Sequence, residues 1–161
     1  MFDWLPQNPI FAIFIWSILE SAILPIPAEV IIIPYAAVSN INSILIATVG
    51  SVGSLIGAFI DYYIGLKGID KLSKILGKDL RSMATGFIQK YKRFGKYGFM
   101  ITLAFGRLFP LSLKPLMFYA GAIRFKLLDY SIVILICSFV RYFIAATIGE
   151  SIASLLISLG L

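Results

Sequence analysis

The chain of 161 residues contains no histidine and a single cysteine, Cys137. Without histidine it lacks the commonest general base and metal ligand, and one cysteine cannot form an internal disulfide. Charged residues make up only 14% of the chain, whereas hydrophobic residues make up 60%. A soluble domain of this size could not cover that much apolar sequence with polar surface. The sequence therefore predicts an integral membrane protein, and we expect no metal site, no cofactor and no enzymatic activity.

The first residues carry neither a basic segment nor a small-residue cleavage site. A removable signal peptide is therefore not expected, and we assign the apolar segments to the mature fold. The absence of targeting signals and the small size favour a prokaryotic plasma membrane.

Two acidic residues flank a pair of prolines inside the first long apolar run. Glu20 and Glu29 lie on either side of Pro25 and Pro27. A carboxylate at membrane depth costs roughly 2.5 to 3.5 kcal/mol, and prolines interrupt helices. Two carboxylates beside a helix break therefore indicate a functional site or a cationic partner elsewhere in the chain.

The apolar runs of the first half predict one hairpin and one crossing helix. Residues 8–38 form the hairpin, which we expect to be re-entrant because neither arm reaches the roughly 20 residues that a crossing needs. Its second arm is expected to be interrupted by Pro34. Residues 41–66 are long enough to cross and carry Asp61. Small residues on this helix predict a close-packing face, made by Gly50, Gly53 and Gly57.

Residues 67–96 are rich in basic residues and place apolar residues at helical spacing. This pattern predicts an amphipathic helix on the membrane surface, and the positive-inside rule puts it in the cytoplasm. Both termini are then expected outside. Contact with anionic lipids explains the basic residues better than a protein partner, and no nucleic-acid partner is expected.

The second half repeats the first with the opposite charge. Residues 97–123 predict a second re-entrant hairpin, with breaks at Pro110 and Pro115. Residues 127–157 predict a second crossing helix. The basic residues of this half that lie at the breaks, at the turn or within the helix are Arg107, Lys114, Arg124 and Arg141.

These segments predict an all-α architecture of two inverted repeats, joined by the basic segment. If that segment is cytoplasmic, the two hairpins enter from opposite sides, as in secondary transporters, whose sites lie at the repeat interface. The acidic residues Glu20, Glu29 and Asp61 would then face the cations of the second half. Such charges need partners or water, because each is expensive in a bilayer. Two readings stay open: ion pairs that only join the hairpins, or an anion site.

Four motifs occur in order along the chain: Glu20-x4-Pro25-x-Pro27-x-Glu29, Gly53-x3-Gly57-x3-Asp61-Tyr62-x2-Gly65, Phe105-Gly106-Arg107-x2-Pro110, and Ala120-Gly121-x2-Arg124. At these residues the sequence resembles the DedA family, also called the SNARE-associated or VTT-domain family, including its YqaA-like branch. The resemblance implies two facing re-entrant hairpins and the movement of lipids, including polyprenyl-phosphate carriers, across the bilayer, with proton coupling.

The chain departs from the family pattern after the proline of the second hairpin. Family members commonly have glycine directly after this proline and arginine three residues beyond it, where this chain has Leu111 and Leu113. Lys114 follows one place later. A lysine can still neutralise a phosphate, but as a point charge rather than as the bidentate fork of arginine.

We therefore expect a flippase or scramblase for a lipid phosphate such as polyprenyl phosphate. The cations Arg107, Lys114, Arg141 and Arg124 would bind the phosphate. The carboxylates would hold these cations when no substrate is bound and release them on protonation. Two alternatives are a proton- or ion-coupled transporter of a small anion and a non-transporting membrane organiser. A homodimer, in which a second copy seals the hairpins, is left open.

Overall fold

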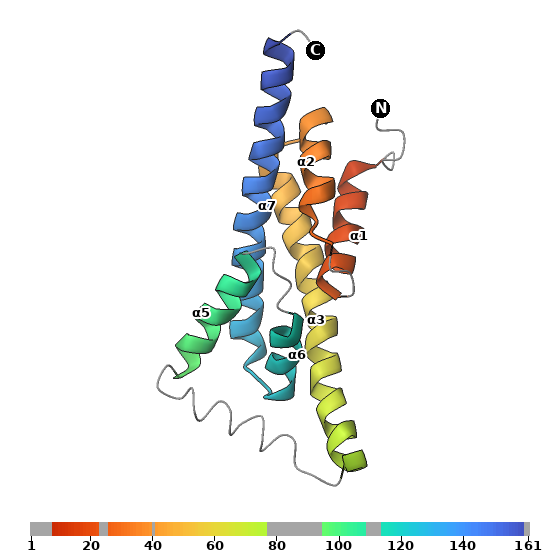
Figure 1. Ribbon diagram of the computed structural model, residues 1–161, viewed down its shortest axis with the longest axis vertical. Helices are drawn as coiled ribbons and strands as arrows, with labels where there is room; N and C mark the ends of the chain where they lie inside the picture. Colours follow the sequence, from red (N-terminus) through yellow and green to blue (C-terminus); the bar gives the residue numbers. More distant parts are fainter. Residues whose placement is uncertain (1–7, 23–25, 40, 77–94, 109–113, 160–161) are drawn as a thin grey trace. The chain divides into compact units, whose positions relative to one another are not determined.

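The computed structural model describes residues 8–22, 26–39, 41–76, 95–108 and 114–159 (Figure 1). These residues form six helices and no strand, which confirms the predicted all-α fold class. The helices are α1 (Pro9–Ala22), α2 (Glu29–Val38), α3 (Ser43–Leu76), α5 (Gly95–Leu108), α6 (Lys114–Ala122) and α7 (Leu127–Ser158).

Two of the helices are long and apolar enough to cross a membrane. The qualifying segments are Ser43–Gly68, with 26 residues, and Leu127–Ser158, with 32 residues. These are the two predicted crossing helices. However, α3 does not end near residue 66: it runs through Gly65 and Gly68 to Leu76. A glycine inside a helix costs about 1 kcal/mol relative to alanine, which a long hydrogen-bonded ladder tolerates. Residues 67–76 therefore extend α3, and the rest of the predicted surface helix, from residue 77 to 94, lies outside the described residues.

The other four helices are shorter than a crossing requires. They contain 14, 10, 14 and 9 residues in α1, α2, α5 and α6, against the roughly 20 needed to span a bilayer. The predicted interruption at Pro34 is wrong, because α2 continues through this proline. Proline removes one helical N–H donor, but in an apolar medium the remaining backbone groups still need their helical partners, which favours continuing the helix.

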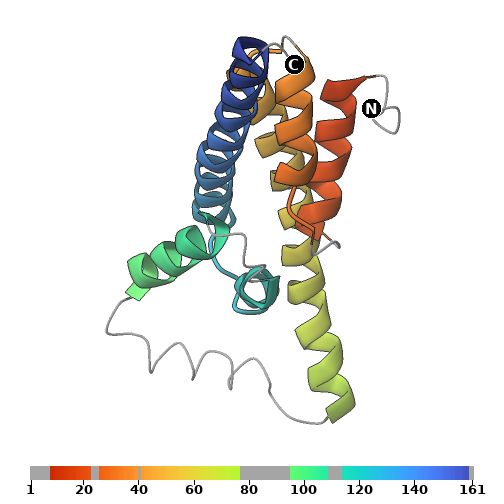
Figure 2. The ribbon, with the colours of Figure 1, turned by 45° about the horizontal axis from the view of Figure 1, so that its top comes forward.

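The chain packs as two compact units, and the two long helices contribute to both. The first unit contains α1, α2, α3 up to Gly57 and α7 from Leu135. Within it, α1 and α2 run side by side in opposite directions (Figures 1 and 2). The second unit contains α3 from Ala58, α5, α6 and α7 up to Ile134. Each unit therefore combines a pair of short helices with parts of the two long ones.

Polar side chains are buried and large apolar side chains are exposed. On α7, the exposed residues include Ile132, Leu135, Ile136, Val140, Ile144 and Ile148. The buried polar residues include Ser17, Glu20, Ser54, Asp61, Arg107, Ser138 and Arg141. Soluble proteins rarely bury charged residues, and they rarely expose large contiguous apolar patches. This distribution is the one expected for helices surrounded by lipid.

Glycines bring the first hairpin into backbone contact with the long helices. A Cβ atom on Gly53 would lie 2.6 Å from the carbonyl oxygen of Phe14, and one on Gly57 would lie 2.5 Å from that of Ile18. Helix α1 therefore rests directly on α3, as the predicted small-residue face required. On the other arm, a Cβ on Gly149 of α7 would lie 2.5 Å from the carbonyl oxygen of Ile33 in α2.

The second unit uses the same kind of contact. A Cβ on Gly65 of α3 would lie 2.0 Å from the carbonyl oxygen of Phe118, and one on Gly121 of α6 would lie 1.9 Å from that of Tyr62. Helices α3 and α6 therefore approach each other through glycine on both sides. In addition, Phe99 near the start of α5 lies 6.2 Å, between ring centroids, from Tyr119 near the end of α6, so the start of α5 lies beside the end of α6.

We predict that Gly57→Ala destabilises the protein, whereas Gly68→Ala does not. The added methyl group at residue 57 would meet the backbone of α1, and overpacking of this kind costs about 1 to 3 kcal/mol. Among the described residues, no atom outside the local helix backbone lies within 4 Å of the Cβ position of Gly68, so alanine there should slightly favour the helix. Thermal unfolding of both purified variants in detergent measures the difference. Equal melting temperatures would contradict the backbone contact between α1 and α3.

Candidate functional site

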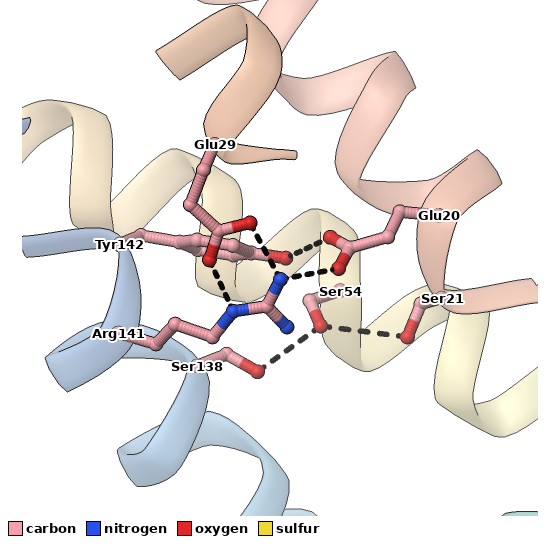
Figure 3. Close-up of polar contacts among 7 residues, drawn as sticks. All are labelled: Glu20, Ser21, Glu29, Ser54, Ser138, Arg141 and Tyr142. Carbon is pink, nitrogen blue, oxygen red and sulfur yellow. Dashed lines mark hydrogen bonds and ion pairs between the residues drawn. The ribbon is translucent and has the colours of Figure 1, made fainter. Parts of the chain in front are cut away.

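A buried arginine binds both arms of the first hairpin (Figure 3). Arg141, on α7, donates from Nε to Oε1 of Glu29 and from Nη2 to Oε2 of Glu29, the latter at 2.6 Å. The same Nη2 donates to Oε1 of Glu20 at 2.7 Å. Because Glu20 belongs to α1 and Glu29 to α2, one guanidinium is shared by carboxylates from both arms. The sequence predicted that acids of the first half meet cations of the second half, and this pairing confirms it for Arg141.

The two carboxylates have different helical settings. Glu29 is the first residue of α2, where the positive end of the helix dipole favours a negative charge. Glu20 lies in the last turn of α1, where the dipole disfavours a carboxylate. Glu20 is therefore more dependent on donors, and it has two: Nη2 of Arg141 and the hydroxyl of Tyr142, which donates to its Oε2 at 2.7 Å.

The charges of this group do not cancel. Two ionised carboxylates share one guanidinium, so the group carries one excess negative charge when both are ionised. Arg141 and Glu20 are only 9% and 8% exposed, whereas the side chain of Glu29 is 23% exposed. An uncompensated charge is costly where water is excluded. The group is thus suited to take up one positive charge, and Glu29 is its more accessible member.

A chain of serine hydroxyls lies in the same unit. Ser21 Oγ is 3.4 Å from Ser54 Oγ, which is 3.1 Å from Ser138 Oγ. The three serines come from α1, α3 and α7, and all are buried. Neither these serines nor the role of Tyr142 was predicted from the sequence. Their spacing from the charged residues could have indicated them. Ser21 adjoins Glu20, and Ser138 precedes Arg141 by three residues, which places Ser138 and Arg141 on the same helical face.

The second unit contains its own buried acid and cation. Asp61, on α3, is fully buried, and Arg107 lies in the last turn of α5, where the helix dipole favours a cation. The charges of both act on the phenol of Tyr130. The Tyr130 hydroxyl donates to the carbonyl of Ala58 at 2.9 Å, which fixes the ring against α3. Tyr130 was also not foreseen from the sequence.

Arg124 follows the end of α6 in an unusual backbone conformation. Its φ is 53°, in the left-handed region that favours glycine. Phe125 N–H donates to the carbonyl of Ala120 at 2.9 Å and Arg124 N–H to that of Gly121 at 3.0 Å, which is the Schellman pattern of a helix C-terminus. An exposed arginine thus occupies the position that glycine usually takes.

The remaining predicted site residues are only partly described. Lys114 begins α6, but its side chain lies outside the described part of the structure. Pro115 is the second residue of α6, in the first turn, where proline is tolerated because its missing N–H would have no helical partner. Pro27 lies between α1 and α2, whereas Pro25 and Pro110 are outside the described residues. Among the predicted residues, the structure thus brings Glu20, Glu29 and Arg141 together in the first unit, buries Asp61 and Arg107 in the second, and leaves Arg124 exposed.

Comparison with known proteins adds a family match. The VTT domain family matches residues 26–151. An alkaline phosphatase-like protein of Lactococcus lactis subsp. lactis (strain IL1403) is 32% identical over 156 residues, which cover 88% of this chain and 71% of that protein. A protein of the same name from L. lactis subsp. cremoris (strain MG1363) is 28% identical over 153 residues, which cover 88% and 70%. No solved structure matches the chain.

We predict that Arg141→Met destabilises the protein and that two further substitutions restore most of the loss. The single change leaves two buried carboxylates without their shared donor, which costs about 3 to 5 kcal/mol. Adding Glu20→Gln and Glu29→Gln removes both charges. Thermal unfolding in detergent compares the single and triple variants, with Lys126→Met as an exposed control. A triple variant no more stable than Arg141→Met would argue against charge pairing as the main interaction.

We also predict that Arg124→Gly stabilises the fold. The left-handed conformation costs a residue other than glycine roughly 1 kcal/mol, which glycine avoids. Arg124→Ala should give no such gain, since alanine meets the same steric penalty. Chemical or thermal unfolding of the two variants tests this. A glycine variant less stable than the alanine variant would show that the conformation is not the source of strain.

Proposed function

Because the chain belongs to the VTT-domain (DedA) family of membrane proteins, we propose that it is a transporter that moves a lipid phosphate, such as polyprenyl phosphate, across the bilayer as a flippase or scramblase. The observation that carries the proposal is the Arg141 guanidinium, buried among apolar helices and held by two carboxylates. A cation in that setting is a ready partner for an anion that enters the protein.

A phosphate competes for the same donors as a carboxylate. The Arg141 fork binds Glu29 through Nε and Nη2, which is also the geometry in which arginine binds phosphate oxygens. Exchange of one oxyanion for another keeps the guanidinium paired throughout. In this proposal, Glu20 and Glu29 hold Arg141 in the resting state and the headgroup replaces one of them during transport.

Protonation provides a way to drive that exchange. The group carries an excess negative charge, so one proton on either carboxylate makes it neutral and weakens one of its bonds to Arg141. Glu29 is the better entry point, since its side chain is the more exposed. Proton coupling is therefore part of the proposal, with the protein taking up a proton as the phosphate binds.

The second unit is proposed to handle the headgroup in a similar way. Arg107 is buried with Asp61 near Tyr130, while Arg124 is exposed beyond the end of α6. In this proposal the exposed Arg124 makes the first contact with the headgroup, and the buried Arg107 then holds the headgroup inside the protein. We include Lys114 among these cations from its position at the start of α6. The lipid tail would stay in the bilayer, against the apolar outer faces of the helices.

The membrane arrangement follows from the same architecture. Four helices are too short to cross, and each unit combines one pair of them with parts of both long helices. This composition supports two re-entrant hairpins in an inverted repeat. We further propose a cytoplasmic basic segment, both termini outside and a prokaryotic plasma membrane. A homodimer is compatible with this arrangement.

The relatives' name suggests chemistry on phosphate groups, and we propose binding without hydrolysis for this chain. The chain has no histidine, and Glu20 and Glu29 are engaged by a cation rather than arranged as a catalytic pair. The buried cations favour one second candidate, a proton- or ion-coupled transporter of a small anion. An organiser without transport activity would need none of the buried charges, and its activity should survive their neutralisation.

Transport of a fluorescent polyprenyl phosphate in liposomes tests the proposal. We expect the wild-type protein to move it faster than empty vesicles and Arg107→Ala to slow it by about tenfold or more, since a hydrogen bond to a charged group contributes about 1.5 to 3 kcal/mol. Lys67→Ala, which removes an exposed cation from α3, should leave the rate unchanged.

A fluorescent phospholipid and labelled inorganic phosphate complete the experiment. Uptake of inorganic phosphate without any lipid movement would favour the small-anion transporter. Equal rates for Arg107→Ala and Lys67→Ala, in variants that melt like the wild type, would contradict the role of the buried cation.

A further inference from the structure

We propose that the hydroxyls of Ser21, Ser54 and Ser138, together with the unoccupied edge of Arg141, form a donor site for the oxygens of a phosphoryl headgroup. The inference rests on the proposed function, because it assigns further binding residues to the same site. It goes beyond the charged residues by giving neutral side chains a part in recognising the substrate.

The hydroxyls are close together but weakly bonded to one another. The separations of 3.4 Å and 3.1 Å exceed the 2.7 to 2.8 Å typical of hydroxyl hydrogen bonds. All three side chains are 1% exposed or less, so bulk water does not reach them. An ionised acceptor forms shorter and stronger hydrogen bonds than a second hydroxyl does. The central hydroxyl, that of Ser54, would therefore gain by donating to a phosphate oxygen in place of a neighbouring hydroxyl.

The guanidinium of Arg141 has one edge left for a ligand. Its Nε and Nη2 bind the two carboxylates, whereas Nη1 makes no hydrogen bond to any described residue. Figure 3 shows Nη1 pointing away from Glu29, toward the side on which the hydroxyls of Ser54 and Ser138 lie. The spacing of Ser138 and Arg141, three residues apart on α7, also puts them on one face. Arginine and hydroxyl donors thus converge from three helices.

A fourth serine hydroxyl has no acceptor within the described part of the structure. Ser17 is fully buried, and its Oγ has no hydrogen-bond partner among the described residues. It lies one turn before Ser21 on α1, on the same face as the hydroxyl chain. A Cβ on Gly50 would lie 2.8 Å from the Tyr142 ring and 3.4 Å from Ser17 Oγ, so this glycine lets the Tyr142 ring pack beside Ser17. A buried donor without an acceptor indicates that a ligand oxygen or a water completes this site.

The chemistry of the donors favours an anion over a cation. The group of Glu20, Glu29 and Arg141 has an excess negative charge, which disfavours an anion until one carboxylate takes up a proton, as in the proposed function. In the neutral group the guanidinium repels a cation, and the serine hydroxyls can donate to an oxyanion. A phosphate monoester presents several oxygens to such donors, whereas a lipid without a phosphate presents none of comparable strength.

Binding of farnesyl phosphate, a short polyprenyl phosphate, to the purified protein in detergent tests the site. Ser54→Ala removes the central hydroxyl and should weaken binding by about tenfold. Ser51→Ala is the matched control, because Ser51 is a buried serine one turn earlier on α3 whose hydroxyl donates to the Thr48 carbonyl at 2.9 Å. We expect its affinity to equal that of the wild type. Ser138→Ala is a second variant in case Ser54→Ala does not fold.

The following results would distinguish the proposed serine site from its alternatives. Equal affinities of the folded Ser54→Ala or Ser138→Ala variant and Ser51→Ala would overturn the inference, as would a wild-type protein that binds neither farnesyl phosphate nor inorganic phosphate. Serine-dependent binding of inorganic phosphate as tight as that of farnesyl phosphate would support the site and identify free phosphate as its ligand. Farnesol, which lacks the phosphate, should not bind in a serine-dependent manner. Serine-dependent binding without transport in liposomes would contradict the proposed function but would still support the serine site.

Discussion

The guanidinium of Arg141 imposes the strongest constraint on the first unit. A charge buried among apolar helices must be paired and hydrogen-bonded, and here the acceptors come from both arms of a hairpin whose helices are too short to cross a bilayer. Tyr142 supplies the donor that Glu20 still needs at the unfavourable end of α1. The polar group therefore joins α1, α2 and α7 from within an apolar core to which the same three helices contribute. Buried ion pairs are poor stabilisers compared with apolar packing, so such a group is better explained by what it binds than by the stability it adds.

Close packing of the helix backbones stabilises the protein in lipid and offsets the free-energy cost of burying these polar groups. The driving force that buries apolar surface in water is missing between helices in a bilayer, so contact area and backbone approach must replace it. Gly53, Gly57 and Gly149 provide that approach in the first unit, and Gly65 and Gly121 provide it in the second. The outer faces can then remain uniformly apolar while serine, aspartate and arginine are kept inside.

Much of this arrangement could be predicted from the sequence. Length and composition identify the crossing helices, the glycine spacing identifies a packing face, and the expense of a carboxylate in lipid requires a cation for Glu20 and Glu29. The errors have physical causes. The interruption at Pro34 was predicted from local propensity, which an apolar environment overrides by demanding continuous hydrogen bonding. The boundary at residue 66 was placed where the basic residues begin, but the helical pattern predicted for that segment continues the same helix to Leu76. The serine chain was not predicted because an uncharged serine costs little in a helix and so does not call for a partner, although its spacing from Glu20 and Arg141 was visible. The conformation of Arg124 depends on a C-terminal turn that composition does not specify.

The two arms of the first hairpin are attached to different supports. Helix α1 rests on the glycines of α3, and α2 rests on Gly149 of α7, so the hairpin bridges the two long helices within this unit. Glu20 and Glu29 travel with their respective arms. A change in the spacing of α3 and α7 there must consequently alter the distance between the carboxylates, and a change in how the carboxylates bind Arg141 must in turn push or pull on the helices. Any exchange of the partners of Arg141 would therefore be coupled to a movement of α3 relative to α7 within this unit.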